Sequence, residues 1–160
     1  MKITLFQRLS VAAFAAAFIA MPTAFTAEVT ELVVETPFED VRQDLSGAVI
    51  NRGYKTDYRA FIGDMLARTS TDVGGKKQIY KNAESIQFCS AVLSRNAMEA
   101  DPANIAYCPY VLFVYESANK PGKTHVGFRR LDETGNDASK TALSNINALL
   151  DEIIGEAADQ

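Results

Sequence analysis

The stretch FCSAVLSRNAMEADPANIAYCPYVLFVYE, from Phe88 to Glu116, decides the fold of this chain. Its first part, from about Ser90 to Ala100, predicts a helix. The pair Asp101-Pro102 ends that helix, because a proline disfavours helical geometry in the residue before it. Its last part, Tyr110 to Tyr115, is an unbroken apolar run that is too short for a helix and rich in strand formers. We therefore expect a strand that is central in its sheet and covered on both faces.

The chain has two cysteines, Cys89 and Cys108, and both lie in this stretch. Far more than two residues separate them, so the CxxC pattern of thioredoxin-like redox proteins is absent. Two lone cysteines in an oxidising compartment usually pair, and these two flank the same helix and turn. We therefore expect a structural disulfide that stabilises the fold by about 3 kcal/mol.

Two other roles for the cysteines stay open. Cys89 lies where the predicted helix begins, and a helix N-terminus favours the thiolate, so Cys89 is also a candidate reactive or redox-sensing group. Alternatively, Cys89, Cys108, His125 and Met98 offer the sulfur and imidazole ligands that suit copper or zinc. The chain has a single histidine and no HxxxH pattern, so these ligands would be a scattered set. We therefore expect no metal site.

Upstream of this stretch, the pattern predicts a strand and then a helix. The strand runs from Val29 to Glu35, which is rich in β-branched residues. The helix begins in the segment Thr36-Pro37-Phe38-Glu39, with Thr36 as the N-cap and Glu39 closing a capping box. It ends at Gly53. The residues spaced three and four apart that this helix should bury are Phe38, Val41, Leu45 and Val49.

Three shorter elements follow. In the segment Tyr54 to Ala60, Thr56 and Tyr58 alternate with charged residues, which predicts a half-exposed strand. A turn at Gly74-Gly75 then precedes a strand from Tyr80 to Phe88. Between the strand that ends at Ala60 and this turn, we expect a brief helix with four apolar residues pointing inward, namely Phe61, Ile62, Met65 and Leu66.

A hairpin and a long helix complete the chain. The turn Asn119-Lys120-Pro121-Gly122 joins the central strand to a strand from Thr124 to Arg130. The last helix, from about Ser139 to Gly155, is amphipathic, and its apolar stripe should cover the sheet. The order βαβαβαββα predicts a single α+β domain with a mixed or antiparallel sheet covered by helices. The stripe of the last helix consists of Leu143, Ile146, Leu149, Leu150, Ile153 and Ile154.

Residues 1–27 match the pattern of a secretory signal peptide. A basic start with Lys2 and Arg8 precedes an apolar run from Leu9 to Met21. This run is shorter than the roughly 20 apolar residues that a transmembrane helix needs. Small residues suit cleavage between Ala24 and Glu28. We expect a periplasmic protein, with residues 28–160 forming one domain and no stable membrane insertion after cleavage.

The charge balance argues against some partner classes. With 16 Lys and Arg against 20 Asp and Glu, the formal net charge is −4. Nucleic acid and anionic lipid surfaces both require a basic face. We therefore expect no nucleic-acid partner, and the acidic balance serves solubility.

The chain resembles the domain of unknown function 302 family of small α+β domains, over roughly residues 29 to 155. Three features carry the resemblance: Phe88-Cys89-Ser90 opening a helix, the helix exit Ala100-Asp101-Pro102, and Cys108-Pro109-Tyr110 entering a strand. Many relatives have an Asn-Pro pair at Cys89-Ser90, so the two cysteines indicate an exported branch. The resemblance implies a fold but no reaction, because the family's biochemical role is itself unsettled.

The sequence favours a binding module over an enzyme. It has no GxSxG, no HExxH and no glycine-rich phosphate loop. We expect a non-enzymatic domain that has no cofactor. It would bind a small ligand or a protein partner, and that partner could be a second copy of the same domain. Its working surface is expected on the open sheet face around His125 and Arg129, which alternate with buried residues. Thiol-redox chemistry through the cysteines and periplasmic copper binding are the alternatives. The aromatic side chains that could line a pocket are Tyr107, Tyr110, Phe113 and Tyr115.

Overall fold

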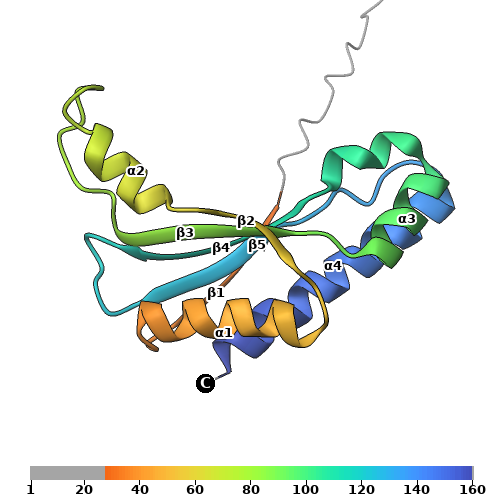
Figure 1. Ribbon diagram of the computed structural model, residues 1–160, viewed down its shortest axis with the longest axis horizontal. Coiled ribbons are helices and arrows are strands. Elements are labelled where there is room, and N and C mark those ends of the chain that lie inside the picture. The colour runs from red at the N-terminus through yellow and green to blue at the C-terminus, as the bar shows by residue number, and fades with distance from the viewer. Residues whose placement is uncertain (1–27, 160) are drawn as a thin grey trace, which may run out of the picture.

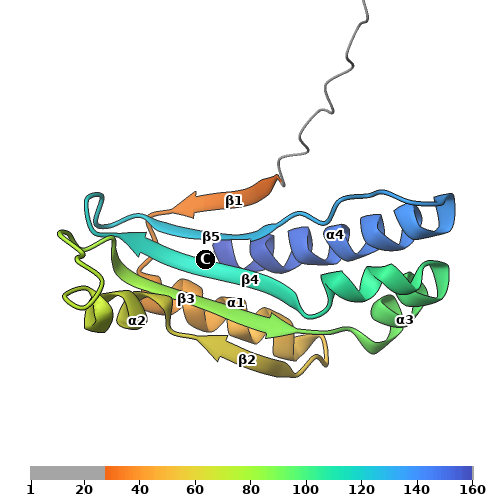
Figure 2. The same cartoon turned by 90° about the horizontal axis from the view of Figure 1, so that it is seen from above.

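Five strands form one antiparallel sheet in the order β1-β5-β4-β3-β2 (Figures 1 and 2). The structure is a computed structural model, and it describes residues 28–159. The predicted order of elements and the α+β class are confirmed, and of the two predicted kinds of sheet, mixed or antiparallel, the protein has the antiparallel one. The strands are β1 (Val29–Val34), β2 (Thr56–Ala60), β3 (Tyr80–Phe88), β4 (Tyr110–Ser117) and β5 (Thr124–Arg129). The helices are α1 (Phe38–Asn51), α2 (Ile62–Thr69), α3 (Ala91–Ala100), the 3-10 helix η1 (Pro102–Tyr107) and α4 (Asp137–Ala158).

The strand β4 is central, as predicted, but only one of its faces is covered by helices. Helices α1 and α4 lie under the sheet, whereas α2 lies on the opposite side near one end of β3 (Figure 1). Along β4, Tyr110, Leu112 and Val114 are buried, while Val111 between them is 41% exposed. The expectation that both faces of β4 are covered is therefore wrong. An unbroken apolar run did not distinguish a strand buried on both faces from one with an apolar open face.

Helix α1 begins one residue later than the capping-box pattern predicted. Pro37 is the N-cap residue, and no side chain makes a capping hydrogen bond there. Glu39 does not close a capping box, because its carboxylate accepts hydrogen bonds from Arg42 and Gln43 within the helix. A local ion pair thus replaces the predicted cap. The four apolar residues of this helix pack into or against the core as expected.

The strand β2 presents a different face from the one predicted. Tyr58 is 58% exposed, whereas the next residue, Arg59, reaches the helix side and donates to the Ser46 hydroxyl at 2.8 Å. The pairing of β2 with β3 is irregular between Thr56 and Tyr58. A bulge inserts an extra residue and so reverses the alternation of side chains beyond it. The sequence pattern carries no sign of that bulge.

The four apolar residues that were predicted to point inward from helix α2 are not buried. Phe61 is 52% exposed and Met65 is 37% exposed, while Ile62 and Leu66 are half-buried. The main contact of this helix is with β3, where Gly63 approaches the backbone of Ala83 so closely that a Cβ would lie 2.9 Å from the Ala83 nitrogen. Contact with one strand leaves Phe61 and Met65 exposed to solvent.

The helix α4 packs against the sheet on the same face as α1, and it is longer than predicted. Asn136 caps it by accepting a hydrogen bond from the Ser139 amide at 2.8 Å. Leu149 is only half-buried, so it lies at the margin of the predicted stripe. The other stripe residues are at most 1% exposed: Leu143, Ile146, Leu150, Ile153 and Ile154.

Among residues 28–159, no helix combines the length and apolar character required to cross a bilayer. The predicted signal peptide, residues 1–27, lies outside the described residues.

Candidate functional site

The candidate site lies on the sheet face opposite α1 and α4. Pairing partners in an antiparallel sheet point their side chains to the same face, so the strand register identifies its members. Helix α2 covers only the β3 end of this face, and the part formed by β1, β5 and β4 has no helix over it (Figure 1). We call this part the open face. Its members are Val29, Glu31 and Val33 on β1, His125, Gly127 and Arg129 on β5, and Val111, Phe113 and Tyr115 on β4.

The floor of the open face depends on Gly127. Gly127 pairs with Glu31 on one side and with Phe113 on the other. A Cβ at this position would overlap the Thr30 carbonyl oxygen and would lie 2.7 Å from Cζ of Phe113. Glycine therefore allows the Phe113 ring to lie over the backbone of β5. The result is an aromatic surface between two polar ends of β5.

One polar end contains three side chains that contact one another. Nδ1 of His125 lies 2.8 Å from Oε1 of Glu31, and the Tyr115 hydroxyl donates to Oε2 of the same carboxylate at 3.0 Å. The Tyr115 and His125 rings also stack, with centroids 4.3 Å apart. Both oxygens of Glu31 are thus engaged. These contacts fix the orientation of Tyr115 and His125 on the open face.

The Tyr115 hydroxyl stays protonated at neutral pH. Burial, the hydrogen bond to Glu31 and the Glu31 charge together raise the pKa of Tyr115 to about 12. A neutral hydroxyl is the donor that the Glu31 carboxylate requires, so the two groups support each other.

Arg129 forms the other polar end. It is exposed, and within residues 28–159 its guanidinium takes part in no ion pair or hydrogen bond. Arg130 beside it, in contrast, forms a two-point ion pair with Asp151 of α4 at 3.0 and 2.8 Å. Arg129 is therefore a free cation at the edge of an aromatic surface.

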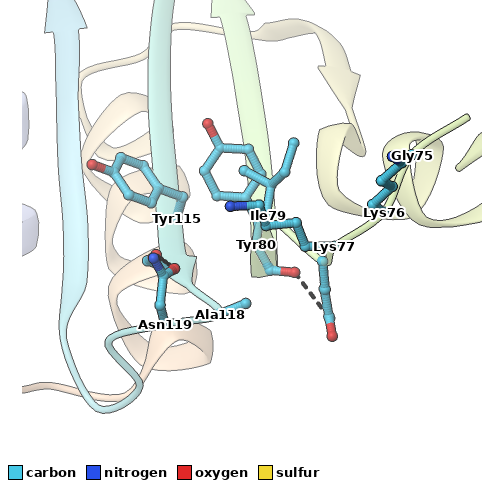
Figure 3. A pocket seen from close by; sticks show the side chains of 10 residues that line it. Gly75, Lys76, Lys77, Ile79, Tyr80, Tyr115, Ala118 and Asn119 are labelled. Atoms are coloured by element: carbon cyan, nitrogen blue, oxygen red, sulfur yellow. Dashed lines mark hydrogen bonds between the residues drawn. The ribbon is translucent and has the colours of Figure 1, made fainter.

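Two hollows adjoin the aromatic side chains. One, of about 330 Å³, lies between Ile62 of α2, Val29 and Glu31 of β1, and the rings of Phe113 and Tyr115. The other, of about 840 Å³, is a groove along the segment from Gly75 to Tyr80 and the end of β4 (Figure 3). Tyr80 and Tyr115 line both, with their ring centroids 5.3 Å apart, so the two hollows share one aromatic wall.

The structure places His125 and Arg129 on one face, as the sequence predicted, with Gly127 between them. Of the aromatic candidates, Phe113 and Tyr115 line this face. Tyr110 is 2% exposed and belongs to the core, and Tyr107 packs against the core. Sequence reasoning missed the roles of Glu31 and Gly127. Only the pairing of β1 with β5 could have revealed them, because the two strands lie far apart in sequence.

The two cysteines lie away from the open face and are bonded to each other. The S–S distance is 2.07 Å and the Cα atoms are 6.2 Å apart, so the expected Cys89–Cys108 disulfide is present. Ser90 is the residue that caps α3, by accepting from the Leu93 amide, and Cys89 precedes this cap. The disulfide thus ties the end of β3 to the entry of β4.

The bonded sulfurs do not form a ligand set with His125. Cys108 precedes β4, whereas His125 pairs with Tyr115 farther along it, which places the two roughly 20 Å apart at strand spacing. Within residues 28–159, no three His, Cys, Asp or Glu side chains gather as a metal would require.

A buried carboxylate on the helix side serves the hairpin instead of the site. Glu116 is 5% exposed and accepts hydrogen bonds from the Gly122 amide at 2.9 Å and from Lys81 Nζ at 3.1 Å. Asn82 donates to its other oxygen at 3.3 Å. The Gly122 amide and then Lys81 and Asn82 hold the pKa of Glu116 below its usual value, against the effect of burial. Glu116 therefore fixes the turn between β4 and β5.

Comparison with known proteins places the fold in a family. The family model described as "Domain of unknown function DUF302" matches residues 30–158. A solved structure, an uncharacterised conserved protein of that family from Bacillus stearothermophilus, superposes with a TM-score of 0.66 at 14% identity, covering 81% of this chain and 97% of that one. At that identity the likeness shows the fold alone. No curated protein matches the chain. Together, the matched residues and the shared sheet and helices establish that the chain belongs to the domain of unknown function 302 family.

Proposed function

We propose that the protein is an exported, non-enzymatic binding domain whose open face receives a small ligand carrying an aromatic ring and an anionic group. The observation that carries this proposal is that Arg129, unpaired among residues 28–159, lies on the open face two residues along β5 from Gly127, the pairing partner of Phe113. A half-buried aromatic floor without a covering helix favours stacking of a flat ring. A guanidinium without a partner favours a carboxylate, which it binds through two parallel hydrogen bonds.

The spacing of these two groups suits one small molecule. Phe113 lies opposite Gly127, and Arg129 is two residues farther along β5 on the same face. Two residues of a strand span roughly 7 Å, which is about the length of an aromatic ring with a carboxylate attached. One ligand therefore reaches both the ring and the guanidinium.

The polar contacts at the other end favour binding over catalysis. Oε2 of Glu31 accepts a hydrogen bond from Tyr115, and Oε1 lies against Nδ1 of His125. This carboxylate therefore orients its neighbours instead of activating a nucleophile. Its negative charge lies on the far side of Phe113 from Arg129, so it disfavours an anion there. The ligand's anionic group is therefore directed toward Arg129.

Calorimetric titration with benzoate tests the proposal, because benzoate has both required features. Benzylamine, which has the ring with the opposite charge, and acetate, which has the charge without the ring, are the matched probes. We expect benzoate to bind and the other two to bind at least tenfold more weakly. Equal binding of benzylamine, or no binding of benzoate, would contradict the proposal.

Two variants and one control assign the binding to the open face. Arg129→Gln and Phe113→Leu should each weaken benzoate binding at least tenfold. Arg95→Gln is the control, because Arg95 is an exposed arginine on α3, 3.1 Å from Glu99 and away from the open face. An equal loss in the control would show that benzoate responds to net charge alone.

Export is the second part of the proposal, and it rests on the basic, apolar and small-residue zones of residues 1–27. A disulfide between the two cysteines supports an oxidising compartment. N-terminal sequencing of protein recovered from a periplasmic extract should find a start between Ala24 and Val29. Recovery only from the cytoplasm, with Met1 retained, would overturn it.

A further inference from the structure

The free edge of the sheet at β1 carries an inference separate from the ligand site. β1 is the last strand of the sheet and pairs only with β5, so one side of it has no strand partner among residues 28–159 (Figure 2). Natural proteins usually protect such an edge with charged side chains, lysine above all, with proline or with a bulge. The strand VTELVV has no lysine, proline or bulge, and its pairing with β5 is regular. Its one charged side chain, Glu31, is engaged by His125 and Tyr115 of its own sheet.

The backbone geometry shows which groups the edge presents. The Arg130 amide donates to the Glu28 carbonyl at 2.8 Å, so residues 28 and 130 form a hydrogen-bonded pair. In an antiparallel ladder such pairs alternate with non-hydrogen-bonded ones. Thr30, Leu32 and Val34 therefore direct their backbone groups toward β5. The N–H and C=O groups of Val29, Glu31 and Val33 point away from the sheet.

We propose that a second copy of this chain pairs with β1, strand to strand and antiparallel, so that the two sheets become one continuous sheet. A two-fold axis makes the contact self-complementary and closes it, because each edge is used once. The exposed apolar residues along this strand support the pairing: Val29 is 56%, Leu32 38% and Val33 48% exposed.

Charge selects the register. The outward N–H and C=O groups belong to odd-numbered residues, so an odd-numbered residue of one copy must lie opposite an odd-numbered residue of the other. Only a few two-fold registers meet this condition. One register places Glu31 opposite Glu31 of the second copy, and another places Glu31 opposite Glu35. Like charges directly opposite are destabilising. A third centres on Thr30 and pairs fewer residues.

The remaining register centres on Leu32 and has none of these defects. It places Leu32 opposite Leu32 of the second copy, Glu31 opposite Val33, and Thr30 opposite Val34. Val33 of the second copy then lies beside Glu31 on the open face. The dimer would therefore extend the wall of the candidate site without changing its floor.

Engineered cysteines test this register directly, because the native cysteines are bonded to each other and leave no free thiol among the described residues. Opposed residues of a non-hydrogen-bonded pair have Cα atoms about 4.5 Å apart. That distance lies within the range a disulfide spans. The two copies of Val33 would be roughly 9 Å apart, which is too far for a disulfide.

Mature protein, recovered after export and carrying Leu32→Cys, should thus form a disulfide-linked dimer on mild oxidation. Val33→Cys on the same strand, and Val92→Cys on an exposed part of α3, should cross-link at least tenfold more slowly. Cross-linking of Val33→Cys as fast as Leu32→Cys would overturn the register. Failure of Leu32→Cys to cross-link faster than Val92→Cys would overturn the dimer.

Sedimentation of unmodified protein provides a readout that does not depend on engineered cysteines. We expect a concentration-dependent dimer in the wild type and a monomer for Leu32→Lys, which would place two like charges at the two-fold axis. Unchanged melting of the Leu32→Lys monomer would show that the domain itself stays folded. A wild type that is monomeric at all accessible concentrations contradicts the proposal.

Discussion

The ring of Tyr115 stacks on the imidazole of His125, with centroids 4.3 Å apart and ring planes 8° from parallel. Glu31 on the neighbouring strand contacts both side chains. Three residues from three adjacent strands thus form one end of the open face. The order β1-β5-β4 in the sheet is what brings them together.

Tyrosine titration checks this cluster. The pKa of Tyr115, about 12, lies above the ordinary value of 10, first because of burial and then because of Glu31. A raised pKa means that the stabilising contribution of the neutral hydroxyl is complete below pH 10 and is lost as the pH rises toward 12. The absorbance difference between wild type and Tyr115→Phe should therefore show ionisation near pH 12. Ionisation near pH 10 would show that Tyr115 is not held as described.

The disulfide should be structural. Cys108→Ser should lower the free energy of unfolding by about 2 to 4 kcal/mol, because the unfolded chain loses its cross-link. The double variant lacking both cysteines should cost about the same as the single variant, since one bond is removed in each. Thiol labelling of the native protein should find neither sulfur. Rapid exchange with glutathione couples would instead support a redox role.

A pair of adjacent leucines measures how α4 supports the sheet. Leu150 is 0% exposed, and Leu150→Ala should lower the free energy of unfolding by about 2 to 5 kcal/mol by leaving a cavity. Leu149 is half-buried, so Leu149→Ala should cost clearly less. Chemical denaturation of both variants gives the comparison. Equal losses would mean that the helix is rotated from the orientation described.

Glu116 should make the stability depend on pH. Hydrogen bonds from the Gly122 amide, Lys81 and Asn82 lower the pKa of Glu116, so its contribution is present at neutral pH and is lost as the pH falls through that lowered value. Glu116→Gln should therefore be less stable than wild type at pH 7. The difference should shrink at acidic pH, as the pH falls through the lowered pKa of Glu116 and the wild-type carboxylate protonates. A difference that stays constant with pH would contradict this role.

The sequence predicted the succession of elements because hydrophobic periodicity and the turn residues are local signals. It also predicted that His125 and Arg129 share a face, because alternation along one strand needs no tertiary information. It did not predict the bulge between Thr56 and Tyr58 or the open face of β4, since both depend on which strands and helices are neighbours. Glu31 was missed for the same reason, because its partners Tyr115 and His125 follow it by 84 and 94 residues on other strands.

The most direct test of the central claim is to map benzoate on the protein by amide chemical-shift changes in a ¹⁵N-labelled sample. The account predicts the largest changes at Phe113, Gly127 and Arg129, with smaller ones along β1. It also predicts that Arg129→Gln abolishes these changes while Arg95→Gln preserves them. Changes confined to the Gly75–Tyr80 groove, or spread evenly over exposed lysines and arginines, would contradict the claim that the open face is the binding site.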